Sequence, residues 1–320
     1  MSSTESTAMP DRPDPPPGAH ADGTLVSGPA ALSRVRLVSW SVRRELWEHR
    51  WIYIVPLIVA AVFLFGFLTA TARVPYPFPQ RVHFTTHSMA RLLEAPFDFA
   101  SGVLMLTYMV VAVIYCLAAL HAERADRSIL FWKSLPVSDL MTVVAKTSIP
   151  LVILPLITVA ITIVTQGIMF LAGSAVLLGR GINAMALWPQ IPLLSMWAAT
   201  VYHVLTVHAL YYAPIYGWLL LVSGWARRAA FLWAILPIAA VLIIEKLVFN
   251  TSIFGHMLLS RLGGGPAALP FPPHGNMPMT APTLANLGAF LASAGLWVGF
   301  AICAVFIAAA VRLRRYQGPI

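Results

Sequence analysis

The sequence predicts an all-α, polytopic integral membrane protein with six transmembrane helices. Hydrophobic residues make up 59% of the 320 residues and charged residues only 10%, whereas an average soluble domain is about 25% charged. Six segments of 16 to 50 residues contain no Asp, Glu, Lys or Arg, and a helix needs roughly 20 apolar residues to cross a bilayer. The segments lack the alternation of barrel strands, and helices are the other structure that satisfies its own backbone hydrogen bonds in lipid.

Residues 1–30 are predicted to be a disordered cytoplasmic tail. This segment is rich in proline and has no apolar run, so it cannot bury enough surface to fold. The transmembrane domain is therefore expected to occupy residues 31–320.

The boundaries of the six spans follow from the charge-free segments and from their helix breakers. We expect spans at about 51–72, 100–122, 147–172, 193–221, 229–249 and 284–311. Pro189 and Pro192 interrupt the apolar run ahead of the fourth span, and 263–273 is rich in Gly and Pro ahead of the sixth. Residues 252–262 are expected to form a short outer helix or a re-entrant piece.

The distribution of Lys and Arg predicts the orientation. Six spans place both termini on one side of the membrane. Fifteen of the 21 basic residues lie on that side, and five lie on the opposite side. Because cytoplasmic loops are enriched in Lys and Arg, both termini are expected in the cytoplasm.

Residues 32–50 are expected to form an amphipathic helix ahead of the first span. Apolar residues recur there at helical spacing, namely Leu32, Val35, Val38, Val42 and Leu46. The charged and aromatic residues off this stripe or at its edge are Arg43, Arg44, Glu45, Trp47 and Glu48. A basic helix with aromatic edges suits the lipid headgroup plane. It serves either as a lipid anchor or as an elbow helix that also touches a cytoplasmic partner.

The connection between the second and third spans is dense in charge but neutral. Glu123 and Arg127 have the spacing of a helical ion pair, Leu135-Pro136 should end that helix, and Ser138 or Asp139 can cap the next one. A lipid-binding loop would be polybasic. A neutral loop that also carries apolar side chains favours docking of a protein, and an ordinary juxtamembrane turn is the alternative.

Two segments of the chain resemble the permease subunits of bacterial type-2 ABC exporters. They are the string RRELWEHR at 43–50 and the string DRSILFWKSLPVSD at 126–139. The resemblance implies an elbow helix at the first string, a coupling helix over 123–136, a second permease copy or homologue, and a location in the bacterial inner membrane. In such an exporter a separate cytoplasmic ATPase binds ATP and Mg and meets the coupling helix. Carried over, the apolar contact comprises Phe131, Trp132, Leu135 and Pro136, and the polar rim comprises Glu123, Arg124, Asp126 and Arg127.

The chain itself lacks a phosphate-binding loop, because no GxxxxGK[ST] motif occurs and none of its three lysines follows a glycine. It is therefore not expected to be an enzyme, to hold a cofactor or to bind nucleic acid. An intramembrane protease would need HExxH or a comparable motif, which is absent. A secondary transporter would show internal repeats, which we do not find, but this class stays open as the alternative. A structural or sensory membrane subunit is a third option.

Polar residues inside the spans supply candidate cargo contacts. His208, Tyr211 and Tyr212 share a face of the fourth span, either as a wall of the substrate path or as partners of neighbouring helices. Glu245 is expected to snorkel to the outer interface with Lys246, and a proton-linked role is the alternative. The two cysteines fall inside apolar runs, so no cysteine metal site is expected.

Overall fold

The computed structural model describes residues 34–73, 86–134, 138–179, 191–264 and 284–318. Within these ranges every regular element is a helix. The helices are α1 Arg34–Glu48, α2 Trp51–Arg73, α3 Thr86–Ala119, α4 His121–Ala125, α5 Ser128–Ser134, α6 Asp139–Ser148, η1 Ile149–Ile153, α7 Leu154–Gly179, α8 Leu193–His203, η4 Val204–Tyr211, α9 Ala213–Trp225, α10 Ala230–Val248, α11 Ile253–Leu262, α12 Leu284–Leu291 and α13 Ala294–Tyr316.

Six helices are long and apolar enough to cross a membrane, which confirms a multi-pass membrane protein of the all-α class. They are Trp51–Arg73, Leu93–Ala125, Asp139–Gly179, Leu193–Tyr211, Ala230–Val248 and Ala294–Tyr316. The third begins earlier than expected because α6, η1 and α7 continue into one another. The sixth begins later because extended backbone at Ser293 separates α12 from α13. The predicted short helix after the fifth span is α11.

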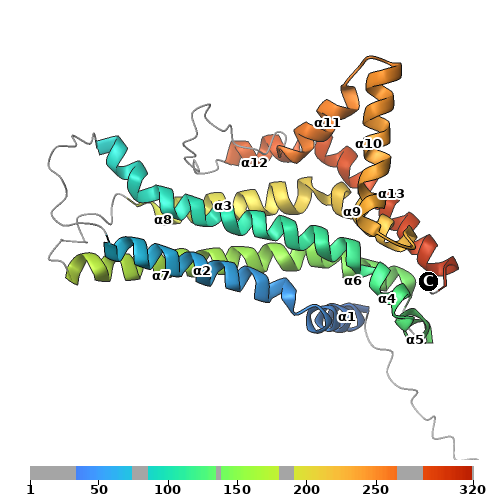
Figure 1. The fold of residues 1–320 in the computed structure, drawn as a ribbon, viewed down its shortest axis with the longest axis horizontal. Coiled ribbons are helices and arrows are strands. Elements are labelled where there is room, and N and C mark those ends of the chain that lie inside the picture. The colour runs from blue at the N-terminus through green and yellow to red at the C-terminus, as the bar shows by residue number, and fades with distance from the viewer. Residues whose placement is uncertain (1–33, 74–85, 135–137, 180–190, 265–283, 319–320) are drawn as a thin grey trace, which may run out of the picture.

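A long bundle forms the body of the protein, with α2, α3, α7 and the continuous series α8, η4 and α9 lying along one another (Figure 1). Its core is unusually rich in tyrosine, since Tyr108, Tyr115 and Tyr216 are fully buried. The predicted tail 1–30 lies outside the described residues.

Two helical stretches in this bundle have π geometry, η1 and η4. Each lies beside a proline, Pro150 within η1 and Pro214 just after η4, and a proline cannot donate the backbone hydrogen bond of a regular helix. At the end of η4 the Tyr212 N–H donates to the carbonyl of Val207 at 3.1 Å, a five-residue separation. The two stretches contact each other, so irregular backbone is concentrated at one level of the bundle.

Helix α10 departs from the bundle at a steep angle (Figure 1). Its first half is held against α9 by the Trp218 indole N–H, which donates to the carbonyl of Ala234 at 3.1 Å, and by contact between Trp225 and Trp233. Its second half contacts α11. Only 6% of the apolar stretch of α10 is buried against the rest of the described chain.

Helices α9 and α13 approach each other closely at Gly217. A Cβ atom on Gly217 would lie 3.2 Å from the Cys303 sulfur and 3.4 Å from the Cys303 backbone. We expect Gly217→Leu to separate the two helices and to destabilise the protein by about 1–3 kcal/mol, seen as a lower midpoint of thermal unfolding in detergent. Gly102→Leu is the matched control, because nothing lies within 4 Å of its Cβ position. Equal midpoints for the two variants would show that the crossing tolerates a side chain.

Candidate functional site

The main concentration of polar chemistry is a buried cluster of charges at one end of the bundle. Lys146 of α6 is 1% exposed, and its ammonium lies 2.7 Å from Glu45 and 3.0 Å from Glu123. The second oxygen of Glu123 pairs with Arg314 of α13. The two carboxylates and two cations therefore come from four helices, α1, α4, α6 and α13.

Two partly exposed residues, Arg44 and Asp139, complete this set. We call the whole set the ionic cluster; its members are Arg44, Glu45, Glu123, Asp139, Lys146 and Arg314. Arg44 lies 3.2 Å from Glu123, and Asp139 lies 3.2 Å from Arg314. The three carboxylates balance the three cations. The Tyr115 hydroxyl also donates to Glu45 at 3.0 Å. Since each buried charge has an opposite partner, the arrangement avoids the large penalty of an unpaired ion.

The sequence did not identify Lys146, Asp139, Arg314 and Tyr115 as site residues, and it misjudged Glu45. Glu45 was expected off the buried stripe of the first helix, but it is 2% exposed. Apolar periodicity cannot detect a charge that is buried against a partner on another helix. A weak signal was available: Lys146 directly precedes 33 residues without charge and follows the apolar residues Val143, Val144 and Ala145.

The connection between the second and third spans differs from the single helix expected over 123–136. It contains two short helices, because Arg127 has a left-handed backbone with φ of 58°. The predicted Glu123–Arg127 ion pair does not form, since Glu123 turns inward to the ionic cluster. Arg124 also turns inward and donates to the Gly224 carbonyl at 2.6 Å. Both side chains are 6% exposed, so neither forms an exposed rim, whereas Asp126 and Arg127 are exposed.

Helix α5 lies on the outside of the ionic cluster, with one contact to the cluster itself and one to the end of α13. The guanidinium of Arg44 lies 3.5 Å from the centre of the Trp132 ring, and Lys133 donates to the backbone carbonyl of Gln317 at 3.1 Å. On its other side α5 exposes Leu130 and Phe131, at 58% and 60%. Ser138 caps the next helix, as expected, by accepting from the Met141 N–H at 3.2 Å. Leu135 and Pro136 lie outside the described residues.

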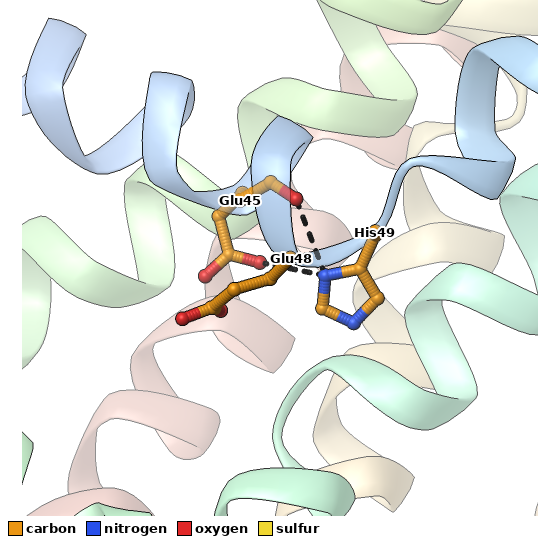
Figure 2. Close-up of side chains that lie close together, drawn as sticks. All are labelled: Glu45, Glu48 and His49. Atoms are coloured by element: carbon orange, nitrogen blue, oxygen red, sulfur yellow. Dashed lines mark hydrogen bonds and ion pairs between the residues drawn. The ribbon is translucent and has the colours of Figure 1, made fainter.

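Figure 2 shows Glu45, Glu48 and His49, three groups close enough together to hold a metal ion. Their charges are already matched by protein cations. Glu45 pairs with Lys146, and Glu48 lies 3.1 Å from Arg44. The His49 Nδ1 faces the backbone carbonyl of Glu45 at 3.3 Å. A divalent ion would have to displace Lys146 and Arg44, so these residues fit an ion-pair network better than a metal centre.

In the middle of the bundle, hydroxyl groups from α3 and α9 join the two π stretches. The Tyr108 hydroxyl lies 2.7 Å from the Pro150 carbonyl and 3.0 Å from the His208 carbonyl, and its single proton is shared between these two acceptors. The Tyr216 hydroxyl donates to the same His208 carbonyl at 2.8 Å. The His208 ring, which is half-buried, contacts Tyr108 and Tyr212 edge-on.

Tyr211 and Tyr212, which were expected on one face with His208, both contact α11, and Tyr212 also contacts the His208 ring. The Arg261 guanidinium stacks 4.3 Å from the Tyr211 ring and donates to the Tyr211 carbonyl at 3.1 Å. The Tyr212 hydroxyl donates to the Leu262 carbonyl. Both tyrosines therefore attach α11 to the bundle, and their role in a substrate path stays a prediction. Glu245 caps α11 by accepting from the Phe254 N–H at 2.9 Å.

Comparison of the chain with protein-family models, with curated proteins and with solved structures gave no match.

The ionic cluster predicts a specific pattern of stability. Lys146→Met leaves Glu45 and Glu123 facing each other with too little positive charge, so we expect a loss of about 3–5 kcal/mol, measured as a lower thermal midpoint in detergent. Glu45→Gln/Lys146→Met should recover part of that loss because it removes the pair together. The control is Arg43→Met, because Arg43 is an exposed cation on α1, the helix that carries Glu45. A Lys146→Met midpoint equal to the control would contradict the assigned pairing.

The hydroxyl bridge predicts a smaller effect at the centre of the bundle. Tyr108→Phe removes the single proton that the Pro150 and His208 carbonyls share, so we expect about 1–3 kcal/mol of destabilisation. Tyr53→Phe on α2, for which no hydrogen bond of the hydroxyl is seen among the described residues, provides the comparison in the same unfolding assay. If Tyr108→Phe and Tyr53→Phe have the same thermal midpoint, the hydroxyl bridge makes no measurable contribution to stability.

Proposed function

We propose that the chain is the membrane-spanning subunit of an ATP-driven exporter of the type-2 ABC class, which forms the substrate path and couples it to a separate cytoplasmic ATPase. The observation that carries this proposal is the ionic cluster beneath an exposed short helix. It joins the helix ahead of the first span, the connection between spans two and three, and the end of span six. A push on α5 would thus reach three parts of the bundle through direct contacts.

The path of that push runs through named side chains. Trp132 contacts Arg44, which contacts Glu123, and Glu123 contacts both Lys146 and Arg314. Lys146 lies at the start of the third span and Arg314 at the end of the sixth. Since buried ion pairs with good geometry cannot separate cheaply, these elements would move as one rigid unit between inward-open and outward-open states.

The ATPase would be another polypeptide, because this chain has no phosphate-binding loop. ATP and Mg would bind there. On this side the docking contact would use Leu130 and Phe131, with Asp126 and Arg127 as the exposed charges of the rim. Both termini and this end of the bundle would be cytoplasmic in a bacterial inner membrane, in agreement with the excess of Lys and Arg.

A second copy of the chain, or a homologue, would complete the transporter. Helix α10 departs from the bundle and leaves most of its apolar surface uncovered by the chain itself. A second permease and membrane lipid would cover this surface, and one set of six spans rarely encloses a path alone.

A secondary transporter without an ATPase is the alternative. It is favoured by Asp98, an acidic side chain within the second span for which no ion pair is seen among the described residues. Ionisable side chains inside spans commonly mark ion or proton pathways.

Co-purification tests the proposal. The full-length chain is isolated from its native membrane in mild detergent, and ATP hydrolysis is assayed on the eluate. We expect an ATPase to accompany the wild type and to be lost from Leu130→Ala/Phe131→Ala, which removes the exposed apolar side chains of α5. The matched control is Phe249→Ala/Leu259→Ala, which removes a similarly exposed Phe and Leu from the α10–α11 region.

An ATPase that stays with the control and leaves the α5 variant supports both the exporter and the docking surface. A folded chain that elutes with no ATPase activity contradicts the exporter and leaves the secondary transporter as the better explanation.

A further inference from the structure

A second polar cluster lies between α3, α7 and α8, away from the ionic cluster. Gln166 of α7 is fully buried, and its amide N–H₂ group donates to the Phe97 carbonyl at 2.9 Å and to the Ser101 hydroxyl at 2.8 Å. Ser101 in turn lies 3.4 Å from the hydroxyl of Thr200 on α8. Three helices therefore contribute polar side chains to one buried point within the membrane-spanning region.

Three buried polar atoms of this region have no hydrogen-bond partner in the part of the chain that is described: Gln166 Oε1, Asp98 Oδ1 and Trp197 Nε1. The orientation of the Gln166 amide is fixed, because the Phe97 carbonyl can only accept, so the nitrogen must face it. The unpartnered atom of Gln166 is therefore Oε1, which is a hydrogen-bond acceptor. Buried polar atoms rarely stay unpaired in native proteins, so these three point to a ligand.

The register of the helices places Asp98 and Trp197 on one side of the contact between α3 and α8. Asp98 lies one turn before Ser101 on α3, and Trp197 lies one turn before Thr200 on α8. Helices α3 and α8 run in the same direction (Figure 1). Asp98 and Trp197 thus lie on the same side of the contact between Ser101 and Thr200.

The surroundings of this cluster are aromatic and thioether side chains. Buried Phe97, Met169 and Met196 pack together there with three further phenylalanines, namely Phe63, Phe67 and Phe170. Aromatic faces attract cations, and polarisable methionines adapt to apolar groups of varied shape. No ion pair of Asp98 is seen among the described residues, so none of the cations described there pairs with this carboxylate.

We propose that this cluster binds the ammonium group of a cationic amphiphile. The Asp98 carboxylate supplies the opposite charge, and Gln166 Oε1 accepts an N–H from the amine. The aromatic and methionine side chains contact its hydrocarbon part, while the Trp197 indole N–H donates to a hydroxyl or carbonyl beside the amine. That such an amphiphile is the exported cargo rests on the proposed function, whereas the binding site stands on its own contacts.

The test measures binding by the full-length chain in nanodiscs of zwitterionic lipid, with empty nanodiscs subtracted. The probes are radiolabelled dodecylammonium, dodecyltrimethylammonium, which keeps the charge but has no N–H, and neutral dodecanol. The variants are Asp98→Asn, Gln166→Leu and, as a control with the same loss of charge, Asp14→Asn in the N-terminal segment. Size-exclusion profiles and circular dichroism report whether each variant is folded.

We expect saturable binding of both cations by the wild type and none of dodecanol. Asp98→Asn should weaken both cations by about tenfold or more. Gln166→Leu should weaken dodecylammonium to a similar degree and leave dodecyltrimethylammonium within about twofold. Asp14→Asn should bind as the wild type does.

The site is overturned if the wild type shows no saturable binding, if dodecanol competes equally, or if Asp98→Asn binds as tightly as Asp14→Asn. These readings do not depend on Gln166→Leu, so misfolding of that variant leaves the proposal testable. No ATPase is present in this assay. The binding site can therefore fail while the exporter stands, and the exporter can fail while the site stands.

Discussion

The pairing of buried charge at one end of the bundle is the constraint on which the rest of the structure depends. Glu45, Glu123, Lys146 and Arg314 are nearly inaccessible to solvent, and an unpaired ion in such a place would cost several kcal/mol. The four helices that carry them must therefore meet at one point and in one register. These helices precede or belong to spans one, two, three and six. The ionic cluster therefore also fixes how one end of the bundle is assembled.

The number, type and approximate extent of the spans could be predicted from the sequence, because a bilayer imposes long charge-free helices whatever their neighbours are. The site could be predicted only in part. The segment 123–146 was expected to dock a protein, which stays a prediction, and the inward turn of Glu123 and Arg124 depends on partners far away in the chain. The left-handed backbone at Arg127, which divides the expected helix, has no local signal, since neither Gly nor Asn occupies the position.

Irregular backbone and its satisfaction explain a second part of the structure that hydropathy cannot reveal. The π stretches depart from regular helical hydrogen bonding, and within lipid a backbone carbonyl requires a hydrogen-bond partner. The Tyr108 and Tyr216 hydroxyls lie within hydrogen-bond distance of the Pro150 and His208 carbonyls. This gives two of the buried tyrosines a partner, and it ties span two to spans three and four at the level of both π stretches. The sequence contains the prolines and tyrosines, but their pairing is a property of the fold.

The two polar regions differ in a way that bears on mechanism. In the ionic cluster every charged side chain has an opposite charge within reach, although Arg44 Nε and Arg314 Nε lack a well-aligned hydrogen bond. Among the described residues, the cluster around Gln166 has two acceptors and a donor without a hydrogen-bond partner. A network of paired charges resists change and can transmit a displacement, because moving one member without the others exposes buried charge. An incompletely paired one is suited to receive a ligand, since the ligand satisfies groups that the protein does not. Under the two proposals, this distribution would distinguish the end of the bundle that couples to an ATPase from the membrane region that receives a ligand.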